Sequence, residues 1–199
     1  MFPFSPQWTE SDSVSLSVNK KAQKVDNTTG IFLYDLINNR SYDTHSMKLV
    51  LWNKEMINNM KKFFFRVSGM YKSFYCPSWV DDIEPCADIK AGIGAIYTTY
   101  NKMYKFYQNN NRTKKVIIFT KDFRVHISEI TSYGYEDMND GEKWGKILLR
   151  TPFEYDIPLN NILMISYLNL VRLDSDTLSI SYETHETAEI DLVFREVDE

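Results

Sequence analysis

Cysteine, histidine and glycine are scarce in this chain, which limits the chemistry that it can carry out. Its 199 residues include 2 cysteines, 3 histidines and 7 glycines. Cys76 and Cys86 have no cysteine or histidine neighbours at the spacing of a zinc site, so we expect free thiols in a reducing compartment, with a Cys76–Cys86 disulfide as the alternative. The sequence contains no phosphate-binding glycine loop, no Gly-x-Ser-x-Gly turn and no His-Glu-x-x-His motif.

The three histidines are isolated from one another along the sequence. His45 and His185 lie in polar, turn-like contexts, and His126 alternates with apolar residues in a predicted strand. We therefore expect structural or surface roles for them. The sequence predicts no catalytic residue, no cofactor-binding residue, no cofactor and no metal ligand, and thus a protein that is not an enzyme.

Long apolar runs and an excess of positive charge are also missing. No apolar run approaches the ~20 residues that a membrane-spanning helix needs, and the first residues lack the basic and apolar regions of a secretory signal. The net charge is -4, and the one basic cluster, residues 112–115, fits a solvated hairpin tip. We expect neither a membrane span nor nucleic-acid binding by sequence readout.

What the sequence does contain is the apolar content of a folded protein, 43% hydrophobic and 15% aromatic. One long amphipathic helix is predicted over residues 53–68, with Asn53 as its N-cap and Gly69 as its left-handed C-terminal cap. Its expected apolar face is formed by residues spaced three and four apart: Trp52, Met56, Met60, Phe63, Phe64 and Val67.

The rest of the chain reads as short strands separated by turn residues, so the predicted fold class is mainly β (α+β). Phe74 and Cys76 alternate with Tyr75 as in a half-buried strand, which Pro77 ends because it lacks an amide donor. The other predicted strands cover residues 14–18, 31–37, 42–51, 96–107, 116–119, 123–127, 130–135, 144–151, 162–173, 178–182 and 188–194.

Acidic and amide side chains gather in two loops: Asp81, Asp82 and Glu84 in one, and Asp137, Asn139 and Asp140 in the other. Such oxygens could coordinate a hard cation. For the first loop we favour a turn in which an aspartate caps nearby amides. In the second, Gly141 comes one position too early for a calcium-binding EF-hand loop, so we favour an Asp-Gly hairpin turn.

Aromatic residues are concentrated in the middle of the chain: Tyr97, Tyr100, Tyr104, Phe106 and Tyr107. Their rings could stack on sugars. Tyrosine is also favoured in strands and at protein interfaces, and we prefer that interpretation.

Several stretches of the chain share a pattern with a known family. They are residues 51–55 (LWNKE) at the start of the helix, 74–82 (FYCPSWVDD), 171–178 (VRLDSDTL), 194–197 (FREV) and, more loosely, 2–8 (FPFSPQW). The second stretch matches an aromatic-x-x-Pro-Ser/Thr-Trp-x-x-Asp box. Together they resemble the distal tail proteins of long-tailed bacteriophages. Residues 87–161 are similar in layout only.

The resemblance implies a tail-tube-like β-sandwich with one flanking helix, interrupted by an inserted small β domain, either an OB-like barrel or a sandwich. Residues 1–82 and 163–199 would form the first domain and residues 83–162 the insertion. The segment 163–199 should then pair with strands before residue 52.

The resemblance also implies a function: a structural virion protein whose ring, a hexamer, joins the tail tube to the tail-tip or baseplate hub. The implied partners are other copies of the chain, the tail tube protein and the tail-tip hub protein, with a tail fibre or a host-surface glycan as further candidates. The implied location is the virion tail tip, after assembly in the host cytoplasm. The alternative function is a carbohydrate-recognition module on the tail tip that binds the host surface.

Overall fold

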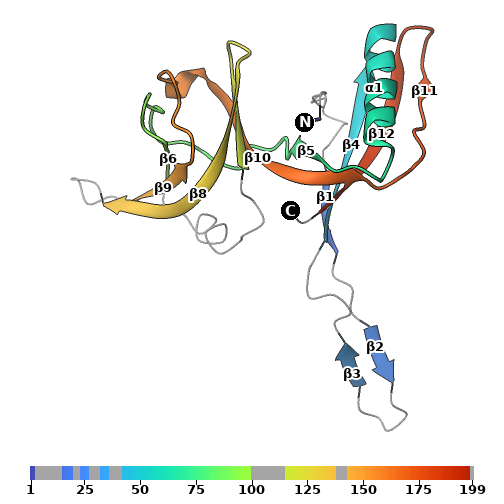
Figure 1. The fold of residues 1–199 in the computed structure, drawn as a ribbon, viewed down its shortest axis with the longest axis horizontal. Helices are drawn as coiled ribbons and strands as arrows, with labels where there is room; N and C mark the ends of the chain where they lie inside the picture. The colour runs from blue at the N-terminus through green and yellow to red at the C-terminus, as the bar shows by residue number, and fades with distance from the viewer. Residues whose placement is uncertain are drawn as a thin grey trace. The chain divides into compact units, whose positions relative to one another are not determined.

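The computed structural model describes residues 1–2, 15–19, 23–26, 32–35, 42–99, 115–137 and 143–197. This part of the chain is mainly β with one α-helix (Figure 1), which confirms the predicted fold class at that level. The chain divides into two compact units. Unit 1 consists of Met1, residues 3–74 and residues 170–199, and unit 2 consists of Phe2 and residues 75–169.

Unit 1 is built from antiparallel strands and the helix. Its strands are β1 (Ser15–Asn19), β2 (Gln23–Asp26), β3 (Phe32–Asp35), β4 (Tyr42–Leu51), β11 (Ser181–Tyr182), β12 (Ala188–Glu196) and the last residues of β10 (Ile162–Leu173). The pairing order is β1-β4-β12-β10, with β11 also on β12, while β2 and β3 form a separate hairpin. The β4–β12 ladder aligns Leu51 with Ala188 and Thr44 with Arg195, which confirms that the end of the chain pairs with a strand before residue 52.

The strand patterns decide which side chains form the core of unit 1. Met47, Leu49 and Leu51 alternate along β4 and are all buried, as their spacing predicts. The partner strand buries Ala188, Ile190, Leu192 and Phe194 in the same alternating way.

The helix α1 (Lys54–Val67) begins and ends close to its predicted limits. The side chain of Asn53 accepts a hydrogen bond from the backbone N–H of Met56 at 2.8 Å, so the predicted N-cap is confirmed. The left-handed C-cap is Ser68, with φ of 55°, one residue before the expected glycine. Gly69 follows in the same region, with φ of 58°.

The buried face of the helix differs in part from the predicted one. The buried side chains are Ile57, Met60, Phe63 and Val67. Trp52 lies between the end of β4 and the start of the helix and is 54% exposed, so its expected place on the helical face is wrong. An aromatic chain then joins the helix to the sheet: the Phe63 and Phe74 rings lie edge to face at 5.0 Å, and the Phe74 and Phe194 rings at 5.8 Å.

Unit 2 is also built from antiparallel strands. They are β6 (Ala95–Thr99), β7 (Lys115–Thr120), β8 (Val125–Asp137), β9 (Lys143–Leu149) and most of β10, paired in the order β10-β7-β8-β9-β6. The first half of β8 pairs with β7 and its second half with β9. The strand β5 (Phe74–Pro77) pairs with β10, and a single 3-10 turn, η1 (Leu159–Asn161), leads into β10.

The core of unit 2 combines buried side chains from these strands with others from the loops. Its buried residues are Ile83, Ile89, Ile96, Val116, Ile118, Ile130, Ile147, Leu149, Phe153, Ile157, Ile165 and Tyr167. Pro77 ends β5 as predicted, and Ile147 and Leu149 share the buried face of β9.

Three strand predictions need correction. No strand is predicted between residues 19 and 30, yet this stretch contains β2, which is paired with β3. The separate strands at 123–127 and 130–135 are one strand, β8, with a register shift between Ile130 and Ser132. The predicted strand 178–182 is reduced to Ser181–Tyr182. Alternation predicts which side chains share a face, whereas a strand also needs a partner edge, and this is set by the tertiary structure.

Replacement of Gly69 by alanine should destabilise unit 1. A Cβ atom there would clash with Oδ1 of Asp176 and would lie 3.1 Å from the Cα atom of Asp176, at a residue whose φ is already positive. The left-handed conformation alone costs an alanine about 1–2 kcal/mol. We expect the free energy of unfolding, measured with urea, to fall by at least about that amount. Gly134→Ala is the control, because a Cβ there meets nothing within 4 Å, and it should change stability by less than about 0.5 kcal/mol.

Candidate functional site

The turn at Ser78–Asp82 is bound to β10 through its backbone. The N–H of Ser78 donates to the carbonyl of Tyr167 at 2.9 Å. The N–H groups of Asp82 and Ile83 both donate to the carbonyl of Ile165, at 3.0 and 3.3 Å. The chain therefore stays attached to β10 after the regular pairing of β5 has ended.

Two carboxylates of the turn complete this attachment. Oδ1 of Asp81 accepts the N–H of Ile165 at 3.0 Å, and Oδ2 of Asp82 accepts the N–H of Tyr167 at 2.8 Å. Oδ2 of Asp82 also forms a short hydrogen bond with the hydroxyl of Ser78. These aspartates do cap backbone amides, but the prediction that the capped amides lie nearby in the turn is wrong, because they belong to the distant strand β10.

Trp79 occupies the centre of the turn in an unusual conformation. Its φ is 58°, in the left-handed region that costs a non-glycine residue energy. Its side chain is only 7% exposed and stacks on Phe119, with ring centroids 5.2 Å apart. Its buried Nε1 has no hydrogen-bond partner. The stabilisation from burying and stacking this ring compensates for the strain in its backbone. Trp79 therefore has a structural role, as a side chain packed in the apolar interior.

The cysteines are both free, as expected, and Cys76 is unreactive. Burial raises the pKa of the Cys76 thiol to about 12. Since the thiolate is the nucleophile, a thiol with this pKa is inert near neutral pH. Cys86 is partly buried.

Each histidine has its own partners. Nε2 of His45 lies 3.1 Å from Oε1 of Glu196 in unit 1, and His185 is exposed near Glu186. In unit 2, Nε2 of His126 is 2.6 Å from the hydroxyl of Tyr155, and its ring meets the edge of Phe153 at 5.8 Å. Burial lowers the pKa of His126 below its ordinary value of 6.5, which favours the neutral ring at neutral pH.

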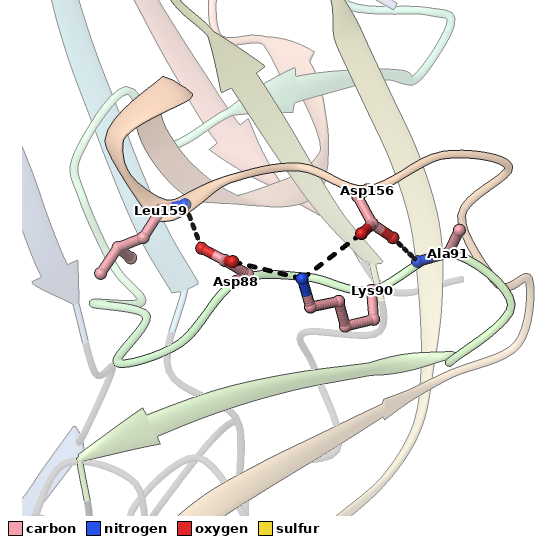
Figure 2. A network of polar contacts seen from close by, with 5 residues as sticks. All are labelled: Asp88, Lys90, Ala91, Asp156 and Leu159. Atoms are coloured by element: carbon pink, nitrogen blue, oxygen red, sulfur yellow. Dashed lines mark hydrogen bonds and ion pairs between the residues drawn. The ribbon is translucent and has the colours of Figure 1, made fainter.

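A polar network in unit 2 joins two loops that sequence reasoning did not connect (Figure 2). Nζ of Lys90 lies 3.3 Å from a carboxylate oxygen of both Asp88 and Asp156. The other oxygens accept backbone N–H groups, from Leu159 to Asp88 at 2.9 Å and from Ala91 to Asp156 at 2.7 Å. No local signal could have found this network, because its two aspartates lie on separate loops far apart in the sequence.

The backbone hydrogen bonds, followed by Lys90, lower the pKa of both aspartates, and the two carboxylates raise the pKa of Lys90. Ile89 and Ile157 directly follow the two aspartates in the sequence. They exchange backbone hydrogen bonds of 3.0 and 2.8 Å, and both side chains are buried. The network therefore fixes the loops that supply two core residues. Because the carboxyl pKa values are lowered by folding, its contribution is present at neutral pH and is lost as the pH falls through the folded values.

The aromatic residues proposed to stack on sugars lie mostly outside the described residues; this applies to Tyr100, Tyr104, Phe106 and Tyr107. Tyr97 is described and is partly buried. Its hydroxyl donates to Glu136 at 3.2 Å, and the ammonium of Lys146 lies 5.4 Å from its ring centroid. Tyr97 therefore already interacts with two side chains of unit 2. Residues 138–142 of the predicted Asp-Gly turn are also outside the described part.

Among the residues that the structure describes, no three His, Cys, Asp or Glu side chains gather in a way that could hold a metal ion. None of the helices in the described ranges has both the length and the apolar character needed to cross a membrane. The best-defined site is the Ser78–Asp82 turn. Its backbone and its two aspartates hydrogen-bond this segment of the chain to β10.

Replacement of Asp82 by alanine should destabilise unit 2, because the N–H of Tyr167 and the hydroxyl of Ser78 both lose their acceptor. A lost partner of a buried polar group costs about 1–3 kcal/mol, and we expect a decrease of that size in the free energy of unfolding in urea. Glu84→Ala is the control, since Glu84 is exposed in the next turn and should change stability by less than about 0.5 kcal/mol. Equal losses in the two variants would contradict the anchoring role of Asp82.

Protonation of His126 should weaken unit 2 as the pH falls. The pKa is lowered on folding, so the unfolded chain takes up the proton first, and stability present at neutral pH is lost as the pH falls. Titration of the His126 ring signals by NMR should give a pKa below the ordinary value of 6.5. The decrease in stability between about pH 7 and about pH 5 should be smaller in His126→Gln than in the wild type. A His126 pKa at or above 6.5 would contradict this prediction.

Comparison of the sequence with protein families and with curated proteins finds no relative. No protein-family model matches the chain, and no curated protein sequence matches it either.

Proposed function

We propose that the protein is a structural component of a phage tail, a subunit of a ring that joins the tail tube to the tail-tip or baseplate hub. The observation that carries the proposal is the geometry of the 74–82 box, the stretch with the most specific resemblance to distal tail proteins. Its aspartates cap the amides of Ile165 and Tyr167, its tryptophan is buried, and its thiol has a raised pKa. These properties suit residues that hold two segments of the chain together rather than residues that react.

The proposed architecture is a tail-tube-like β-sandwich formed by unit 1, with α1 flanking it, and an inserted small β domain formed by unit 2, of the OB-like barrel or sandwich type. Two features support the insertion. The chain enters unit 2 after Phe74 and leaves it at Asn169. The entering strand β5 also pairs with the leaving strand β10, which keeps entry and exit close, as an inserted domain requires.

A ring subunit needs surfaces that bury apolar groups against its neighbours. Unit 1 exposes several large apolar side chains: Trp52 at 54%, Phe65 at 76% and Tyr71 at 83%. Exposed aromatic side chains are typical of protein interfaces. The proposed partners are further copies of the chain in a hexamer, the tail tube protein and the hub protein, at the virion tail tip after assembly in the host cytoplasm.

The test is to image the purified full-length chain by electron microscopy, determine its mass in solution, and label it with an antibody in phage particles. We expect a closed ring of six copies and labelling at the tail tip. A chain that remains monomeric and is absent from particles would refute the proposal. Binding of the monomer to host-surface glycans would instead support the carbohydrate-recognition alternative.

A further inference from the structure

The second half of α1 and the turn after it form a positively charged region of unit 1. Residues 56–74 contain no aspartate and no glutamate, whereas they contain four cations: Lys61, Lys62, Arg66 and Lys72. The side chains of the last three are exposed. Nζ of Lys61 donates to the hydroxyl of Tyr182 at 3.3 Å, and this neutral partner leaves the lysine charge in place. No opposite charge is therefore available within this stretch of the chain.

The three exposed cations are also not neutralised by carboxylates from other parts of the described chain. Elsewhere in unit 1, Nζ of Lys48 lies 2.6 Å from Oε2 of Glu189. Lys62, Arg66 and Lys72, in contrast, form no ion pair with any residue that the structure describes. Their charges face water, so carboxylates from outside the chain can pair with them.

Two large aromatic side chains lie among these cations. Lys62, Phe65 and Arg66 are three and four residues apart, so they share one face of α1, opposite its buried face. Phe65 is 76% exposed on this face, and Tyr71, in the turn after the helix, is 83% exposed. We call Lys62, Phe65, Arg66, Tyr71 and Lys72 the helix-end patch.

Hydrogen bonds hold the turn against the end of the helix. The N–H of Lys72 donates to the carbonyl of Val67 at 3.0 Å, which brings Lys72 back to the last residue of α1. The N–H of Met70 donates to Oδ1 of Asp176 at 2.9 Å, and this carboxylate forms no ion pair with a described cation. The turn is therefore fixed before a partner binds, which reduces the entropy lost on association.

The composition of the helix-end patch favours a protein partner over a nucleic acid or a membrane. Nucleic-acid affinity comes from neutralising many phosphates, whereas the patch offers three exposed cations. A helix that binds a lipid surface turns its apolar face toward the lipid. The apolar face of α1 is instead buried in unit 1. Exposed aromatic and arginine side chains are typical of protein interfaces, and the charge of this surface fits an acidic one.

We propose that the helix-end patch binds an acidic segment of another protein. Carboxylates of that segment pair with Lys62, Arg66 and Lys72, and an apolar side chain between them packs on the rings of Phe65 and Tyr71. This inference rests on the proposed function, because it assigns the chemistry of one neighbour to the exposed side chains of unit 1. The rings supply most of the binding energy, and the charges supply the specificity.

The test measures the affinity of the full-length chain for a fluorescein-labelled peptide by fluorescence anisotropy. In this peptide, pairs of glutamates alternate with single phenylalanines. A second peptide has glutamine in place of every glutamate. We expect the acidic peptide to bind more weakly as the salt concentration rises, and the glutamine peptide to bind at least about tenfold more weakly than the acidic one at low salt.

Two variants test the patch without weakening the helix. Phe65→Ala should raise the dissociation constant of the acidic peptide about tenfold or more. Lys62→Glu should do the same, because the new carboxylate repels the peptide and pairs with Arg66 four residues later. The unfolding temperature should not fall in either variant, since alanine favours a helix and the new pair stabilises one. This readout separates a lost contact from a lost fold.

Each variant has a matched control. Lys54→Glu makes the same change in net charge at the other end of α1, and Phe123→Asn removes a ring that is 96% exposed in unit 2. Both should bind the acidic peptide as the wild type does. If Lys62→Glu and Lys54→Glu weaken binding equally, net charge alone accounts for it and the proposal is overturned. Equal weakening by Phe65→Ala and Phe123→Asn would overturn it as well.

The remaining outcomes separate this inference from other partners and from the proposed function. Equal affinity for the two peptides would overturn the acidic partner. Tighter binding to single-stranded DNA, or to vesicles that contain phosphatidylserine, would overturn it in favour of a nucleic acid or a membrane surface. A chain that is labelled at the tail tip but does not bind the acidic peptide would refute the patch and leave the proposed function standing. A chain that binds the peptide through the patch but is absent from particles would support the patch and refute the location.

Discussion

The strand β10 has backbone groups that must be satisfied along its whole length, and much of the described structure follows from how this is done. Its first residues pair with β7 and its last three with β12. Where the pairing of β5 ends, the carboxylates of Asp81 and Asp82 accept amides that would otherwise lack a partner. Buried amides without acceptors are costly, so the turn that contains these aspartates is as necessary to the fold as a strand.

Strain occurs at three non-glycine residues of the described chain, and its consequences differ. Ser68 ends the helix, and Trp79 is stacked on Phe119, so each helps to form the fold around it. Phe123 has the same kind of backbone conformation but directs its ring into solvent. The left-handed conformation thus belongs to a helix cap at Ser68 and to a buried aromatic stack at Trp79, whereas at Phe123 it carries an exposed ring.

Helix limits, strand faces and caps were predictable because they depend on neighbours in the sequence. Asn53 can cap the helix through a bond that spans only three residues, and the alternation of Met47, Leu49 and Leu51 directly expresses the pleat of a strand. For the Ser78–Asp82 site, the sequence predicted the type of interaction but not the residues that take part in it. That an aspartate would cap amides could be inferred from its turn, but the capped amides of Ile165 and Tyr167 lie more than 80 residues away.

The sequence by itself determined a mainly β chain with one long helix, the alternation that selects its core, and free cysteines. The tertiary structure alone decided that β2 and β3 pair, that β8 is one strand, that Asp88 and Asp156 share Lys90, and that the ring of Phe123 stays in water. The physical reason is the range of each interaction. Periodicity and caps act within a few residues, whereas strand partners, shared ion pairs and burial depend on segments that only folding brings together.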